Sequence, residues 1–182
     1  DGSDSFERFS AFGADANAYT AQSRTVYLFS CTDRFEKSLA ELITFTTHPY
    51  FTPETVAREQ GIIAEEIRMN ADDPWEVCYA RMLRGLYTPV REGGNPVREE
   101  ICGSETSIRR ITPAILKRIH EVFYRPDNMI LAVAGRVTPE EIVAAVEAAC
   151  LPSPAPKPAA SRRRVRHVPE VYKAADTVTM DT

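Results

Sequence analysis

Hydrophobic and polar positions repeat with two different periods along this chain. In several stretches apolar residues recur every three or four positions, which is the spacing of amphipathic helices. Three of these stretches begin with a Thr-Pro pair, in which threonine caps the first turn and proline takes its first position. We expect helices over residues 3–12, 33–47, 52–70, 75–87, 112–123 and 138–150.

Other stretches alternate with a period of two or are continuously apolar. Residues 16–22 and 24–31 are rich in Tyr, Thr, Val and Phe, and a turn near Ser23 separates them. They predict two adjacent antiparallel strands. The apolar run 128–134 predicts a further strand. The expected fold class is therefore α+β, with a largely antiparallel sheet that helices cover on one face.

A proline-rich stretch divides the chain unequally. Residues 151–161, LPSPAPKPAAS, contain four prolines, which favours an extended connector. We expect a first domain over 1–150, a linker over 151–161, and the start of a second domain or a tail over 162–182. The first domain is long enough to fill one core, because 43% of the 182 residues are hydrophobic.

Charge and composition narrow the function classes. The net charge is −4 and the pI is near 5.5, so nothing general favours nucleic-acid or anionic-membrane binding. No run approaches the roughly 20 apolar residues of a membrane span. We therefore expect a cytoplasmic protein with no nucleic-acid or membrane partner. Four scattered cysteines without a C-x-x-C motif predict reduced, mostly buried thiols, with two disulfides as the alternative if the protein is exported.

Two glutamates stand out within the helix expected over 52–70. At about 100° per residue, Glu59 and Glu66 lie only about 20° apart on the helical wheel. Their neighbours on the wheel are apolar: Val56, Ile62, Ile63 and Ile67. Both carboxylates are therefore expected to face inward, whereas Glu65 faces outward. An inward carboxylate needs a cation, hydrogen-bond donors or water, so the pair is a candidate site.

An ordinary structural network is the alternative interpretation of these carboxylates. Inward glutamates can pair with arginines and take no part in chemistry. Arg24, Arg81 and Arg84 are possible partners, although the sequence does not place them near the helix. From the helix alone, the structural and the functional interpretations are equally supported.

Three longer segments resemble one family. They are FGADANAYTAQSRTVYLFS, HPYFTPETVAREQGIIAEEIRMNADDPWE and YRPDNMILAVAG, in that order along the chain. Together they resemble the first domain of the M16, or insulinase-like, zinc peptidases, also called inverzincins. The likeness covers roughly Ser5 to Cys150 and is greatest to the compact bacterial members.

The resemblance implies roles for four residues. In that family, zinc is held by two histidines of an H-x-x-E-H helix and by a glutamate on a later helix, which matches Glu66. Glu59 matches a second acid that supports the site. The NAYT segment matches an edge strand along which the peptide substrate lies, so Asn17 and Ala18 are implied to contact substrate. The alternative for this segment is a plain strand with Tyr19 in the core.

One departure from the family pattern is large, because no H-x-x-E-H motif occurs in the 182 residues. The general base and two zinc ligands are therefore missing from this sequence. The first hypothesis is a fragment of a zinc endopeptidase, inactive by itself, whose whole form has a second, similar domain or subunit. The second is a non-catalytic M16-like peptide-binding or partner subunit, and a structural domain with arginine-paired glutamates is a weaker third.

Overall fold

The computed structural model describes residues 4–150, so the expected linker and tail lie outside the described residues. The described chain forms two compact units. The first comprises residues 4–20, 24–52 and 112–150, and the second comprises 21–23 and 53–111. No helix within 4–150 is long and apolar enough to cross a membrane.

The elements of the first unit are α1 (Ser5–Ala11), β1 (Ala14–Ala21), β2 (Arg24–Cys31), α2 (Phe35–Thr47), α6 (Pro113–Phe123), the 3-10 helix η3 (Pro126–Asn128) and α7 (Pro139–Ala149). Those of the second are α3 (Pro53–Asp72), α4 (Pro74–Leu86), the 3-10 helices η1 (Val90–Glu92) and η2 (Pro96–Arg98), and α5 (Glu105–Ile108). The α+β class and the six expected helices are confirmed, whereas α5 was not expected.

The predicted helix starts are right at two Thr-Pro pairs and wrong at one capping box. Thr112 accepts a hydrogen bond from the backbone N–H of Ile115, and Thr138 forms a reciprocal capping box with Glu141. At α2, the spacing of Asp33 and Glu36 in the sequence also predicts a capping box, and this box does not form. Arg34 takes a left-handed conformation (φ 54°), and the Asp33 carboxylate accepts from the N–H of Arg34 instead.

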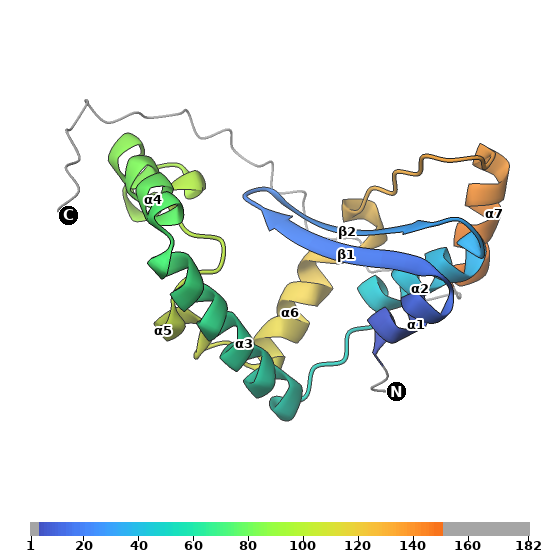
Figure 1. The fold of residues 1–182 in the computed structure, drawn as a ribbon, viewed down its shortest axis with the longest axis horizontal. Coiled ribbons are helices and arrows are strands. Elements are labelled where there is room, and N and C mark those ends of the chain that lie inside the picture. The colour runs from blue at the N-terminus through green and yellow to red at the C-terminus, as the bar shows by residue number, and fades with distance from the viewer. Residues whose placement is uncertain (1–3, 151–182) are drawn as a thin grey trace. The chain divides into compact units, whose positions relative to one another are not determined.

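The core of the first unit lies between one face of the β1–β2 hairpin and helices α1 and α2 (Figure 1). Phe9 of α1 stacks on Phe29 of β2, with ring centroids 5.9 Å apart. Tyr27 of β2 meets Phe45 of α2 edge-on at 5.7 Å. Leu39 and Phe9 are buried. The hairpin thus has helices on one face, as the sequence predicts, because its aromatic residues alternate onto that face.

The strand expected over 128–134 does not form. Residues 129–134 are irregular, and the sheet of the described chain contains β1 and β2 alone. The side chain of Ile130 is 96% exposed. An apolar run becomes a strand when another strand supplies hydrogen-bond partners, and the sequence pattern cannot show whether that partner is present.

A polar and aromatic cluster connects α6 to β2 and α2. The hydroxyl groups of Tyr27 and Tyr124 are 2.6 Å apart, and the ring of His120 stacks on Tyr124 at 4.7 Å. His120 Nε2 lies 2.8 Å from the carbonyl oxygen of Thr46. Because a carbonyl only accepts, Nε2 carries the proton and donates it. The bond satisfies one of the last carbonyls of α2, which have no partner within the helix.

We predict that Tyr27 makes the stability of this unit fall in alkali. Burial, and then the hydrogen bond to Tyr124, raises the pKa of Tyr27 well above its usual value of 10.0. The neutral phenol is thus favoured in the folded state, and its contribution is fully present below about pH 10. Above that pH the free energy of unfolding falls by up to about 1.4 kcal/mol per pH unit.

Chemical denaturation between pH 8 and 11 measures this decline. Tyr27→Phe should abolish most of it, whereas Tyr50→Phe, at an exposed position, should leave it unchanged. An equal alkaline decline in all three proteins would contradict the assignment to Tyr27.

Candidate functional site

Helix α3 carries both glutamates of the candidate site, and it packs along one limited arc. Its buried side chains are Val56 and Ala64, and Gln60, Ile63 and Ile67 are half-buried. On the helical wheel these five positions span about 100°. Helices α4 and α5 of the same unit contact α3, so this arc is the packed face of the helix.

The prediction that Glu59 and Glu66 face inward is wrong. Both side chains are exposed, because they lie roughly 100° from the centre of the packed arc. The error came from counting Ile62 as an inward residue, although it is 57% exposed. The two carboxylates therefore lie together on one flank of α3, in contact with solvent.

The predicted arginine network does not involve these glutamates either. Glu65 pairs with Arg68 on the same helix, and Arg84 of α4 pairs with Glu100. Within residues 4–150, no hydrogen bond or ion pair joins Glu59 or Glu66 to another side chain. A carboxylate without a fixed cationic partner is available to bind an incoming cation. The interpretation that these glutamates only pair with arginines therefore loses its support.

Cys102 lies within the electrostatic influence of Glu66. Burial raises the pKa of the Cys102 thiol, and the negative charges of Glu66 and then Glu100 raise it further. The thiol is half-buried, in the turn that precedes α5. The charge of Glu66 therefore acts on this turn.

All four cysteines are free thiols, as predicted. Cys78 and Cys150 are nevertheless exposed, so the expectation of burial is wrong for these two. Across the described residues, no cluster of three or more His, Cys, Asp or Glu side chains could hold a metal ion. Catalytic zinc takes about three protein ligands plus a water, so the described residues fit one ligand, Glu66, and not the complete set.

Asn17 and Ala18 lie on β1, in the first unit. The two-residue turn pairs Ala21 with Arg24, which places Ala18 opposite Tyr27 in a non-hydrogen-bonded pair. The hydroxyl groups of Thr20 and Thr25, 3.4 Å apart, agree with this register. The N–H and C=O of Ala18 therefore point to the outer edge of β1. There the Asn17 Oδ1 atom accepts the Ala18 N–H at 2.8 Å.

The surroundings of this strand are apolar. Ala16, Asn17 and Ala18 border a shallow hollow, and most of its remaining lining is aromatic or aliphatic: Phe6, Phe9, Tyr27, Leu28, Leu42 and Phe45. Tyr19 is exposed, so the alternative that places it in the core is wrong. Because β1 pairs only with β2 among the described strands, its outer edge offers backbone groups to a further strand.

Two models of one family match most of this chain. Residues 2–89 match the model described as insulinase (peptidase family M16), and residues 110–181 match the model described as the peptidase M16 inactive domain. The chain belongs to the M16 peptidase family.

Curated relatives carry zinc-protease names. An uncharacterized zinc protease of Bacillus subtilis, YmfH, is 43% identical over 143 residues, which cover 79% of this chain and 32% of the relative. A probable zinc protease of Escherichia coli, PqqL, is 31% identical over 155 residues, or 83% of this chain and 16% of the relative. The chain thus spans a third or less of the length of these relatives.

Solved structures show the same fold. The crystal structure of a putative M16-like peptidase from Alicyclobacillus acidocaldarius superposes with a TM-score of 0.75 at 38% identity and covers 81% of this chain and 34% of that one. A protease from Helicobacter pylori superposes with a TM-score of 0.70 at 22% identity, over 80% of this chain and 35% of that one, a likeness of fold alone.

Sequence reasoning missed two features that bear on the packing of α3. One is the 100–111 segment, which contains Cys102 and the short helix α5. The other is Gln60, a polar residue inside the packed arc of α3. The S-x-x-S spacing of Ser104 and Ser107 was the available signal for α5, because the two hydroxyls cap this helix reciprocally.

We predict that Glu66 slows the reaction of Cys102 with alkylating reagents. In a protein with the other cysteines replaced by serine, the pH at which alkylation reaches half its maximal rate should lie above that of an ordinary thiol. Glu66→Gln removes a nearby negative charge and should lower this midpoint, whereas Glu59→Gln serves as the matched control. The same midpoint in all three proteins would contradict the proximity of Glu66 and Cys102.

Proposed function

We propose that this chain is part of a zinc-dependent endopeptidase of the M16 type, and that Glu66 is one of the zinc ligands. The observation that supports this most directly is an exposed carboxylate without a fixed partner on α3, in a chain whose relatives are named zinc proteases. Zinc, when bound, supplies a Lewis acid and an activated water for peptide hydrolysis. Glu59, seven residues earlier on the same flank, supports the orientation of Glu66.

The remaining ligands and the general base must come from residues that are not in this sequence. None of the three histidines belongs to an H-x-x-E-H motif. We therefore expect the 182 residues by themselves to be inactive and to bind zinc weakly or not at all. In this proposal residues 1–150 form an incomplete peptidase domain, 151–161 a linker, and 162–182 the start of a second domain or a tail. A similar second domain or subunit completes the active protein.

Peptide substrate is proposed to add to the outer edge of β1. The free edge at Ala18 and the apolar hollow beside it support this mode, in which backbone hydrogen bonds supply affinity and side-chain pockets supply preference. The Asn17 side chain already accepts a hydrogen bond from the N–H of Ala18. It must therefore turn away before a substrate carbonyl can accept from that N–H. Asn17 and Ala18 would then both contact the substrate.

The first test compares proteins expressed from the complete reading frame. The wild type should contain stoichiometric zinc and cleave peptides, and Glu66→Gln should lose both. Glu76→Gln, a change at an exposed carboxylate of α4, is the control and should retain both. Zinc is measured by elemental analysis and cleavage with a fluorogenic peptide. Full zinc content and activity in Glu66→Gln would exclude Glu66 as a ligand.

A non-catalytic M16-like subunit is the second candidate. The absence of H-x-x-E-H from the 182 residues is the observation that favours it. Such a subunit would bind peptides or an active partner without zinc. A complete wild-type protein that is free of zinc and inactive, yet folded, would support this candidate over the peptidase.

Strand addition predicts an alternating response to N-methylation of the peptide. Every second backbone N–H of an added strand points toward β1, so methylating those nitrogens should raise KM at least about tenfold, because each change removes a hydrogen bond and adds a clash. Methylating the nitrogens between them should have little effect. Uniform sensitivity along the peptide would contradict addition at a strand edge.

A further inference from the structure

Rotation of α3 about its own axis decides where the Glu66 carboxylate points. We propose that the 100–111 segment fixes this rotation and thereby positions Glu66, with Gln60 and Arg68 as its positioning residues on α3. This inference rests on the proposed role of Glu66 as a zinc ligand. All the residues concerned belong to the second unit.

Gln60 provides the first anchor. Its side-chain Nε2 donates one hydrogen bond to the carbonyl oxygen of Ile108 at 2.9 Å and another to that of Ile111 at 2.8 Å. Both donors of the amide are therefore used, at a half-buried position. Ile108 is itself only 4% exposed, so its carbonyl has limited access to water. Loss of the amide would remove one hydrogen bond from each carbonyl; Ile108 would keep only the bond from the N–H of Ile111, and the loss is costly at a half-buried site.

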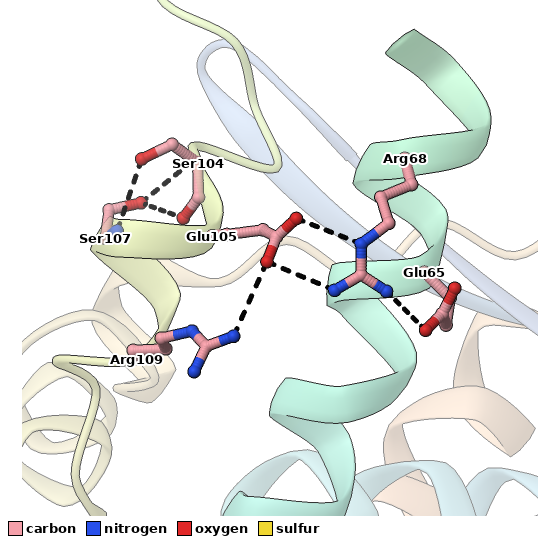
Figure 2. Close-up of polar contacts among 6 residues, drawn as sticks. All are labelled: Glu65, Arg68, Ser104, Glu105, Ser107 and Arg109. Atoms are coloured by element: carbon pink, nitrogen blue, oxygen red, sulfur yellow. Dashed lines mark hydrogen bonds and ion pairs between the residues drawn. The ribbon is translucent and has the colours of Figure 1, made fainter. Parts of the chain in front are cut away.

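Arg68 provides the second anchor, on the side of α3 next to the one that carries Gln60. Its Nε and Nη2 atoms donate to the two carboxylate oxygens of Glu105, at 3.0 and 3.2 Å. Figure 2 shows Glu105 directed from α5 toward Arg68, while Glu65 and Arg109 contact the same pair from either side. This planar two-point contact restrains direction as well as distance. The contacts with Arg68 and then Arg109 also lower the pKa of Glu105.

The charge of Glu66 also acts on this segment, because it raises the pKa of the Cys102 thiol, whereas Glu105, three residues later, contacts Arg68 directly. Glu66 and Arg68 point in directions about 160° apart on the helical wheel. Ile108, later in the same segment, is buried, and its carbonyl accepts the hydrogen bond from Gln60. A helix that is held at Arg68 and along its packed arc cannot rotate freely, so the direction of Glu66 is restrained.

The proposal is tested in the protein expressed from its complete reading frame. Gln60→Glu preserves the size of the side chain but removes both N–H donors at neutral pH. We expect it to weaken zinc binding by about 10-fold to 100-fold, the usual range for residues that orient a metal ligand, and to lower kcat while KM changes little. Zinc affinity is measured by competition with a chelator, beside the thermal midpoint.

A second set of variants tests the proposal in case Gln60→Glu does not fold. Arg68→Met changes an exposed side chain and Glu105→Gln a half-buried one, and each should weaken zinc binding by about threefold or more. The double variant should be no weaker than the single ones, because both remove the same contact. Arg68→Lys keeps the charge without the two-point geometry and should restore only part of the affinity. Arg118→Met on α6 is the control and should match the wild type.

The outcomes separate this inference from the proposed function. If Glu66→Gln keeps its zinc, the proposed function fails. If Glu66→Gln loses zinc while the Gln60, Arg68 and Glu105 variants bind it as tightly as the wild type, the positioning role fails and the proposed function stands. A lower thermal midpoint with unchanged zinc affinity and kcat also overturns it, because the anchors would then be structural only.

Discussion

The packing of α3 along one limited arc is the constraint on which the candidate site depends. Val56 and Ala64 are buried in this arc and Gln60 lies between them, so the rotation of the helix is set by contacts on that side. Glu59 and Glu66 are consequently placed on the flank, exposed and without a fixed cation. A fully buried carboxylate would tend to become neutral, whereas an exposed one stays ionised and available to a metal.

The two compact units contribute different parts of the proposed function. The first presents a hairpin in which the outer edge of β1 is not paired with another described strand and lies beside an apolar hollow. The second presents a helix with a candidate zinc ligand and a segment that restrains its rotation. In the proposed function, peptide recognition and metal coordination would rest on separate elements, one held by aromatic packing in the first unit and the other by polar anchors in the second.

Much of the fold was predictable from local patterns. Six helices and the hairpin follow from spacing and from caps such as Thr112 and Thr138, and the family follows from three linked motifs. The strand expected over 128–134 failed because strand pairing depends on a distant partner. The inward direction of Glu66 failed because Ala64 and Gln60, which give little hydrophobic signal, define the packed arc, while the apolar Ile62 is exposed.

The most direct test of this account is a crystal structure of the protein from its complete reading frame, with diffraction recorded on both sides of the zinc absorption edge. The account predicts an anomalous peak about 2.0–2.2 Å from a carboxylate oxygen of Glu66, with the Gln60 and Arg68 anchors intact. A zinc peak bound elsewhere, with the Glu66 carboxylate directed into solvent, would contradict it.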